Sequence, residues 1–176
     1  MIESLVPFNL QQWLQENEAS FQPSGGTKVL FKDSQLLIFV SAGPNTRGDF
    51  HVTDSPEFFY QLKGGIVIEY IEDGKRLKSR VQEGEVALMP AMVPHSPQRP
   101  AGTLGLVIER IRRPDDSDGF HWYCNNCDAK LHEVAKWDGK VLRDSQELTR
   151  EFESNEELRT CKSCGKVQPI ADGPRI

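Results

Sequence analysis

The sequence predicts an all-β domain, built as an antiparallel sandwich or barrel, with a short N-terminal helix and a small C-terminal extension. Short runs rich in branched and aromatic residues recur between residues 29 and 111, and turn signals separate them. No long helical pattern interleaves these runs, which argues against a parallel α/β fold.

The first expected element is an amphipathic helix over residues 9–21. Asn9 can cap its first turn, and Gln12 follows three positions later. Apolar side chains then follow helical spacing, with Asn17 as the one polar interruption. These apolar residues are Leu10, Trp13, Leu14 and Phe21. We expect this face of the helix to pack on a sheet.

Five strand-like runs follow the helix. They are residues 36–41, 58–62, 66–71, 86–89 and 104–111. Pairs and triplets of turn-forming residues separate them, at residues 43–45, 64–65, 73–74, 83–84 and 101–102. This regular alternation of short strands and turns is the basis of the all-β prediction.

The composition changes after Arg113. Residues 114–119 form a polar linker, and the last 63 residues hold all four cysteines and few strand-like runs. We therefore expect a catalytic domain over residues 1–113 and an extension over residues 114–176. An extension this small and polar needs a staple, and a bound metal is a common one.

The overall composition limits the classes of protein. Of the 176 residues, 38% are hydrophobic and 27% are charged, which suits a globular core rather than disorder or a membrane protein. The net charge of −5 argues against a nucleic-acid partner. Residues 1–18 lack the basic start and continuous apolar core of a signal peptide. We expect a cytoplasmic protein without a membrane partner.

Two spaced motifs resemble those of the cupin superfamily. Glu57 and Gly64 fit the first motif, and Gly84, Pro90 and His95 fit the second. The sequence departs from the superfamily in two ways: the first motif keeps only one histidine, His51, and Met92 stands where glycine is usual. The resemblance implies a double-stranded β-helix, or jelly-roll barrel.

The same resemblance implies a metal site made by His51, Glu57 and His95. Two imidazoles and one carboxylate leave open positions on a metal, as in mononuclear Fe(II) sites that handle O₂. In the alternative interpretation the histidines are ordinary turn or core residues and Glu57 is a solvated acid. Three residue types in two spaced motifs favour the metal site.

Two arginines flank the expected metal ligands. Arg47 lies four residues before His51, and Arg99 lies four residues after His95. Arginine binds carboxylates through a planar fork, so the pair suggests a carboxylate-bearing substrate. Glu109 shares a strand face with Val107, and the pattern leaves open whether that face is buried or at a solvated edge.

A narrower resemblance covers the chain from the N-terminal helix to the last cysteine pair. Residues 43–51, 57–61, 94–100, 107–110 and 122–124 are similar to the 3-hydroxyanthranilate 3,4-dioxygenase family. Phe50 stands where that family is expected to have tyrosine. The resemblance implies a ring-opening reaction of 3-hydroxyanthranilate with O₂ that gives 2-amino-3-carboxymuconate semialdehyde, in the kynurenine route to quinolinate and NAD.

This resemblance also implies roles for the site residues. His51, Glu57 and His95 would hold Fe(II), and Arg99 would pair with the substrate carboxylate. Arg47 would assist Arg99 or bind dioxygen, and Glu109 would bind the substrate amine or hydroxyl and accept a proton. The alternatives are another metal-dependent cupin enzyme acting on a small carboxylate-bearing substrate, and a sensor or electron carrier whose functional site is the cysteine cluster.

The four cysteines form two CxxC pairs, Cys124 with Cys127 and Cys161 with Cys164. Two such pairs can close a tetrahedral Fe or Zn site, and a closed site points to a structural role. Redox motifs or buried free thiols are the alternatives. The pairs resemble the knuckles of rubredoxin, which microbial members of the family carry, and the family also implies a homodimer. His132 is a possible extra ligand, and His121 is expected to be structural or exposed.

Overall fold

The computed structural model describes residues 7–21, 25–31, 35–137 and 142–170. The helices are α1 (Leu10–Asn17), the 3-10 helix η1 (Glu18–Phe21), α2 (Ser145–Ser154) and α3 (Glu156–Arg159). The strands are β1 (Gly26–Val29), β2 (Leu36–Ala42), β3 (Asp49–Thr53), β4 (Glu57–Lys63), β5 (Ile66–Glu72), β6 (Lys75–Val81), β7 (Val86–Met89), β8 (His95–Gln98), β9 (Leu104–Arg110), β10 (Asp118–Tyr123) and β11 (Lys130–Ala135).

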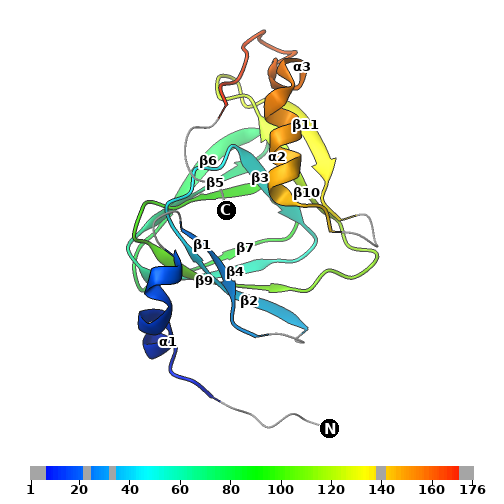
Figure 1. The fold of residues 1–176 in the computed structure, drawn as a ribbon. Coiled ribbons are helices and arrows are strands. Elements are labelled where there is room, and N and C mark those ends of the chain that lie inside the picture. The colour runs from blue at the N-terminus through cyan, green and yellow to red at the C-terminus, as the bar shows by residue number, and fades with distance from the viewer. Residues whose placement is uncertain (1–6, 22–24, 32–34, 138–141, 171–176) are drawn as a thin grey trace.

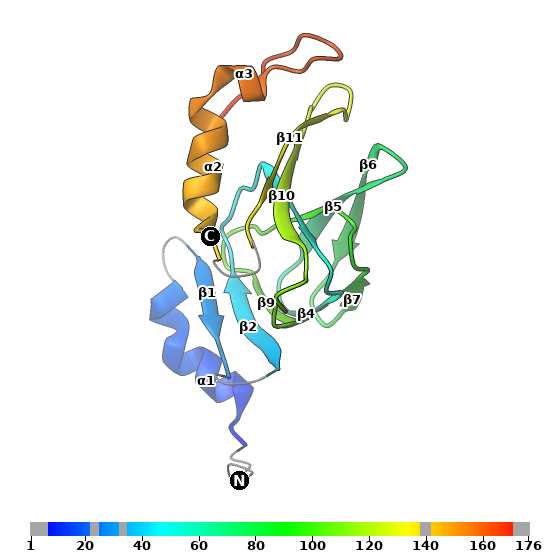
Figure 2. The same cartoon turned by 90° about the vertical axis from the view of Figure 1, so that its right-hand side faces the viewer.

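These strands form two antiparallel sheets, so the all-β prediction is confirmed. One sheet has the order β1-β2-β9-β4-β7, and the other has the order β11-β10-β3-β8-β5-β6. The two sheets curve around a common interior, with α1 below and α2 beside β10 (Figures 1 and 2). All five strand-like runs of the sequence lie on observed strands, and the run at 86–89 coincides with β7.

The space between the sheets is divided between an apolar core and a polar cavity. The core contains Phe59, Ile66, Ile68, Val81, Met89 and Val107. Strand β9 contributes side chains to both the core and the cavity, because every second residue along it is buried. Val107 enters the core, and Glu109, two residues further on, lines the cavity.

The N-terminal helix forms where the sequence predicts it but ends earlier. Asn9 caps α1, since its side chain accepts a hydrogen bond from the Gln12 N–H at 3.0 Å. The helix ends at Asn17, whose side chain donates to the Trp13 carbonyl at 2.9 Å, and η1 continues to Phe21. Trp13 and Phe21 pack against β2, as expected. Over the described residues, no helix is long and apolar enough to cross a membrane.

The extension contributes more sheet than its composition suggests. The expected linker at 114–119 is two residues too long, because Asp118 and Gly119 begin β10. Strand β10 pairs with β3 and with β11, and therefore continues the six-stranded sheet across residue 113. Its buried residues Phe120 and Trp122 pack against Leu148 and Phe152 of α2. The division into residues 1–113 and 114–176 stays a prediction.

Candidate metal centre and active site

Strand register brings the three expected metal ligands together. His51 and His95 are direct cross-strand partners on β3 and β8, so their side chains point to the same side of the sheet. Glu57 begins β4 of the facing sheet. Its Oε1 lies 2.8 Å from His51 Nδ1 and 3.2 Å from His95 Nε2. All three residues are buried, and one ligand atom from each falls within 4.8 Å of the others.

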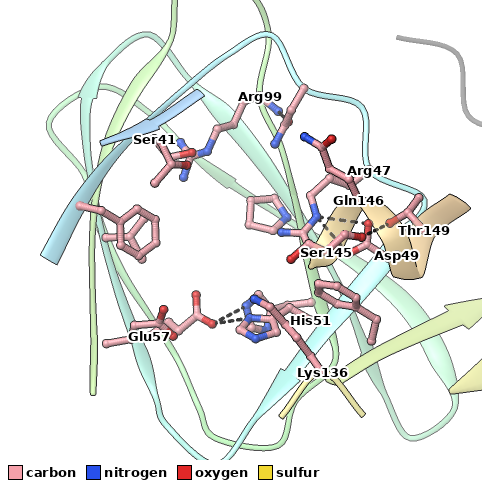
Figure 3. A pocket seen from close by; sticks show the side chains of 18 of the residues that line it. Ser41, Arg47, Asp49, His51, Glu57, Arg99, Lys136, Ser145, Gln146 and Thr149 are labelled. Atoms are coloured by element: carbon pink, nitrogen blue, oxygen red, sulfur yellow. Dashed lines mark hydrogen bonds and ion pairs between the residues drawn. The ribbon is translucent and has the colours of Figure 1, made fainter. Parts of the chain in front are cut away.

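The donor set fits a divalent metal ion. Two imidazole nitrogens and a carboxylate oxygen converge without any apolar atom between them, as Figure 3 shows for His51 and Glu57. Burial alone would raise the pKa of Glu57, but the two imidazoles hold this pKa well below its ordinary value. A buried carboxylate that stays ionised between two histidines is a suitable metal ligand.

A second carboxylate supports His51 from outside the cluster. Asp118 Oδ1 lies 2.9 Å from His51 Nε2, on the ring edge opposite Glu57. Although burial opposes it, the charge of Glu57, together with hydrogen bonding to Asp118, raises the pKa of His51 to about 9. Such an outer carboxylate fixes the orientation of a metal-binding imidazole.

The second cupin-like motif contains the unusual Met92, and the structure shows its consequence. Met92 has φ of 63°, in the left-handed region that glycine adopts freely. Its N–H donates to the Thr53 carbonyl at 2.8 Å, which holds the turn in place. The expected glycine is therefore absent, but the backbone conformation that it would favour is present.

The three donors line a cavity of about 330 Å³. Aliphatic and aromatic side chains form part of its wall, among them Val29, Leu37, Phe39 and Phe59. Arg47 and Arg99 lie across the cavity from Glu57 in Figure 3. The cavity therefore combines apolar walls, candidate metal donors and several cations, Arg47 and Arg99 among them.

Arg99 is held in the wall with part of its charge uncompensated. The side chain is buried, and Nη1 has no hydrogen-bond partner among the described residues. Burial and the nearby charge of Arg47 lower the pKa of Arg99 to about 10. Gly105 makes this position possible, because a Cβ there would lie 2.6 Å from Arg99 Nη1. An incoming anion would satisfy the free donor.

Arg47 is already paired. Its Nε donates to Asp49 Oδ2 at 3.2 Å, and the guanidinium lies 5.5 Å from the centre of the Phe120 ring. Although burial opposes it, the charge of Asp49 raises the pKa of Arg47. Arg47 thus lines the same cavity as Arg99 but has less free hydrogen-bonding capacity.

The structure resolves the question that the strand pattern left open for Glu109. The side chain is 5% exposed and lines the cavity rather than a solvated edge. Its Oε1 accepts from Arg112 Nη1 at 2.8 Å, whereas Oε2 has no hydrogen-bond partner among the described residues. Burial and the charge of Glu57 raise the pKa of Glu109.

The four cysteines converge at the far end of the extension. Sγ of Cys124 lies 3.6 Å from Cys164, Sγ of Cys127 lies 3.6 Å from Cys161, and all four sulfurs are within 4.8 Å of one another. Desolvation alone would raise the pKa of the Cys161 thiol, but hydrogen bonds from the backbone N–H groups of Cys164 and Ser163 lower this pKa to about 6. Four converging thiols with this support suit a tetrahedral metal.

The two CxxC turns have the same backbone design. The N–H four residues after the first cysteine returns to that cysteine's carbonyl, from Asp128 to Cys124 at 3.0 Å and from Gly165 to Cys161 at 2.8 Å. Asp128 and Gly165 both have positive φ. His132 stacks on Trp122 and Phe152 and is not part of the thiol cluster. His121 is partly buried, with Nδ1 3.0 Å from the Tyr123 hydroxyl.

Several residues of the site were missed by sequence reasoning. Among the polar ones are Asp118, Arg112, Lys136, Ser145, Gln146 and Thr149. Burial lowers the pKa of Lys136, a further cation of the cavity wall. Ser145, Gln146 and Thr149 belong to α2, so the extension supplies part of the cavity (Figure 3). The alternation of Asp118, Phe120 and Trp122 was the one available signal for β10.

A two-sheet β-barrel with buried His, Glu and His donors in an open cavity defines a metal-binding cupin. A family model described as 3-hydroxyanthranilic acid dioxygenase matches residues 2–153. The chain belongs to this family of oxidoreductases.

Curated relatives agree with this assignment. The 3-hydroxyanthranilate 3,4-dioxygenase of Bacillus cereus is 44% identical over 96% of this chain and 95% of its own length. The enzyme of that name from Shewanella woodyi is 38% identical, over 99% and 93%. Among solved structures, the chain is similar to a cupin-2 domain containing protein from Shewanella frigidimarina, with 19% identity and a TM-score of 0.43 over 56% of this chain and 92% of that one.

Proposed function

We propose that this protein is an Fe(II)-dependent dioxygenase that opens the ring of 3-hydroxyanthranilate. Both atoms of O₂ enter the product, 2-amino-3-carboxymuconate semialdehyde, a precursor of quinolinate and NAD in the kynurenine pathway. One observation carries the proposal: a single cavity combines the His, Glu and His donors with an unsatisfied arginine and a free carboxylate oxygen.

His51, Glu57 and His95 would hold the iron. Once bound, Fe(II) would supply Lewis acidity and open positions for the substrate's hydroxyl and amine and for O₂. The chain's own contribution is to fix these donors. Cross-strand pairing sets the two histidines, and Asp118 holds the His51 ring from the other side.

Arg99 would bind the substrate carboxylate. Its free Nη1 and lowered pKa indicate a charge that lacks a full set of partners among the described residues. A carboxylate there would gain a charge-assisted hydrogen bond. Arg47, held by Asp49 at the same wall, would add a second positive charge or donate to dioxygen. The apolar wall would contact the aromatic ring and keep bulk water away.

Glu109 would bind the substrate's amine or hydroxyl and accept a proton. Its free Oε2 can accept a hydrogen bond from the amine or the hydroxyl at the position next to the metal donors. Burial raises the pKa of Glu109, which makes the carboxylate a better proton acceptor than an exposed glutamate. Glu109 would therefore accept the hydroxyl proton when the substrate binds.

The test is O₂ uptake by anaerobically Fe(II)-loaded protein given 3-hydroxyanthranilate, with the product followed by absorbance and mass. We expect one O₂ consumed for each ring opened, and no uptake by His51→Ala. Arg80→Gln, on the exposed side of β6, is the matched control and should keep full activity. A metal-loaded wild-type protein that leaves the substrate intact would refute this function and favour another small carboxylate-bearing substrate.

We propose that the four-cysteine cluster holds Fe or Zn in a structural role. A closed four-thiolate site has no open position for a substrate. The four cysteines belong to the same extension as α2, and α2 lines part of the cavity wall. Metal analysis of the reconstituted protein should find two metals per chain, of which only one changes its spectrum on adding 3-hydroxyanthranilate. A response at the cysteine site would contradict the structural role.

We also propose a cytoplasmic homodimer. CxxC pairs that serve as metal ligands rather than as disulfides are typical of a reducing compartment. Tyr60, Val86 and Leu88 are exposed on the outer face of β4 and β7, next to an edge of the five-stranded sheet. Such an apolar surface suits contact with a second copy. Light scattering of the wild type and of Leu88→Lys should show a dimer and a monomer, respectively.

A further inference from the structure

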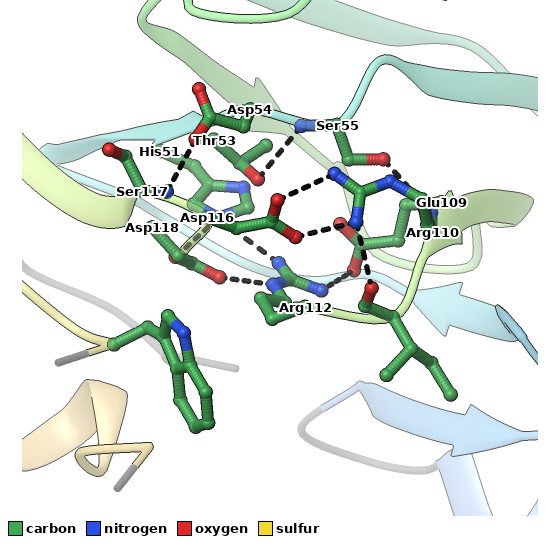
Figure 4. Close-up of polar contacts among 12 residues, drawn as sticks. His51, Thr53, Asp54, Ser55, Glu109, Arg110, Arg112, Asp116, Ser117 and Asp118 are labelled. Atoms are coloured by element: carbon green, nitrogen blue, oxygen red, sulfur yellow. Dashed lines mark hydrogen bonds and ion pairs between the residues drawn. The ribbon is translucent and has the colours of Figure 1, made fainter. Parts of the chain in front are cut away.

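Arg112 lies between two buried carboxylates that come from different sheets. Its Nη1 donates to Glu109 Oε1 at 2.8 Å, and its Nε donates to Asp118 Oδ2. Glu109 belongs to β9 of the five-stranded sheet, and Asp118 begins β10 of the six-stranded sheet. Figure 4 shows the guanidinium between them. Arg112 therefore joins the two sheets beside the cavity.

The contact with Arg112 fixes which oxygen of Glu109 remains free. Oε1 is occupied by Nη1, so rotation of the carboxylate is restricted, and Oε2 is left buried without a hydrogen-bond partner among the described residues. Among the described residues, Arg112 is the side chain that holds the Glu109 carboxylate in this orientation. The side chain of Arg112 is itself 12% exposed and lines the same cavity.

Asp118 anchors the arginine from the other side. Its side chain is fully buried, and its two oxygens are divided between His51 Nε2, at 2.9 Å from Oδ1, and Arg112 Nε, at Oδ2. Asp118 thus holds both the Arg112 guanidinium and the His51 ring in position. Only arginine suits this place, because its planar fork can bond two carboxylates in different directions, and a lysine ammonium is a single point.

We propose that Arg112 is a positioning residue that orients the free oxygen of Glu109 toward the substrate. Through Asp118 it also fixes the position of Glu109 relative to His51. This inference rests on the proposed ring-cleavage function, in which Glu109 binds the substrate's hydroxyl or amine. Arg112 itself donates to the two carboxylates, and its Nη2 also lies 3.4 Å from His51 Nε2, but its proposed effect on turnover runs through Glu109. The same charge also offsets two of the acids gathered around the cavity, Glu109 and Asp118.

The test compares Arg112→Gln and Arg112→Lys with the control Arg110→Gln. Arg110 forms an equally close pair with Asp116, at 2.6 Å, but lies outside the cavity lining. At equal catalytic iron content, Arg112→Gln should lower kcat about 10- to 100-fold, as losing an outer-shell partner does. Arg112→Lys should recover part of the loss, and Arg110→Gln should match the wild type.

A double-mutant cycle with Glu109→Gln identifies the route of the effect. If Arg112 acts through Glu109, Arg112→Gln should cost little in kcat once Glu109 is already glutamine. Losses of kcat that agree within about twofold in both backgrounds would mean independent sites and would overturn the proposal. The anaerobic dissociation constant of 3-hydroxyanthranilate should show the same coupling, which a purely structural role would not produce.

Two other outcomes would also overturn the proposal. One is an Arg112→Gln protein with wild-type kcat and substrate affinity. The other is a folded variant that does not retain catalytic iron, since Arg112 would then act on the metal centre rather than on Glu109. Turnover by the wild type and by Arg110→Gln reports separately on the proposed function, so a failure of that function is distinguishable from a failure of the Arg112 assignment.

Discussion

Replacing Arg99 by methionine should make the protein more stable and less active. Methionine keeps an unbranched, flexible side chain and removes the buried charge. Burial and Arg47 lower the pKa of Arg99 to about 10, and each pKa unit corresponds to about 1.4 kcal/mol. Holding Arg99 charged therefore costs the fold about 3 kcal/mol. The cost is complete below about pH 10 and shrinks only above it, so it is present at neutral pH.

The charge of Arg99 that destabilises the fold should instead strengthen the binding of the substrate carboxylate. A hydrogen bond between charged groups contributes about 1.5–3 kcal/mol, which corresponds to a loss of about 10- to 150-fold in kcat/KM for 3-hydroxyanthranilate. The loss should be specific to the carboxylate. 2-Aminophenol has the hydroxyl and amine but no carboxylate, so its binding to the Fe(II)-loaded protein should change little between wild type and Arg99→Met.

The assays are urea unfolding of the metal-loaded protein and steady-state O₂ uptake. We expect the free energy of unfolding to rise by about 1–3 kcal/mol, since the loss of the side chain's packing offsets part of the gain. Arg80→Met, an exposed control, should change neither quantity. An unchanged kcat/KM would refute the carboxylate assignment for Arg99, and a clear loss of stability would refute the reasoning from its unsatisfied charge.

Three further predictions concern the packing, the extension and the metal. Gly105→Ala places a Cβ 2.6 Å from Arg99 Nη1, so kcat/KM should fall about tenfold or more in O₂ uptake, and an unaffected rate would contradict the close fit. Cys161→Ser should lower the melting temperature and release the cysteine-site metal but retain turnover; inactivity of a folded, iron-loaded variant would be inconsistent with a structural cluster. In metal-free protein, the proton on His51 adds stability below about pH 6.5 that is lost as pH rises through about 9. Since Fe(II) must displace this proton, its apparent affinity should rise about tenfold per pH unit from pH 7 to 9, and an anaerobic titration with a flat profile would exclude that linkage.

Strands with an apolar pattern were predictable from the sequence, and strands rich in charged residues or built around the site were not. Residues 66–71 and 86–89 alternate or cluster apolar side chains, and they correspond to β5 and β7. Strand β6, with the sequence KRLKSRV, is mostly exposed at the end of its sheet and carries four charges, so it gives no apolar signal. Strand β8 contains a proline and the candidate metal donor His95, and its composition reflects the site rather than the sheet.

The candidate ligands were predictable because the motifs that contain them resemble those of the cupin superfamily. Arg112 and Asp118 were not, although both are visible as charges in the sequence. They are six positions apart, Asp115 and Asp116 lie between them, and Arg110 lies just before. Which acid pairs with which arginine depends on where β10 joins β3, and that register is set by contacts far apart in the chain.

The composition boundary at residue 113 divides residues that the fold places around one cavity. Asp118, which supports His51, and Ser145, which lines the cavity wall, both follow the boundary. Helix α2 is fixed by the stacking of Phe152 on Trp122, with ring centres 4.6 Å apart. Beyond it, α3 leads directly to Cys161. A metal held by the four cysteines, as proposed above, would therefore restrain the end of the segment that lines this cavity, so a polar extension can complete the cavity without supplying any of the His, Glu and His donors.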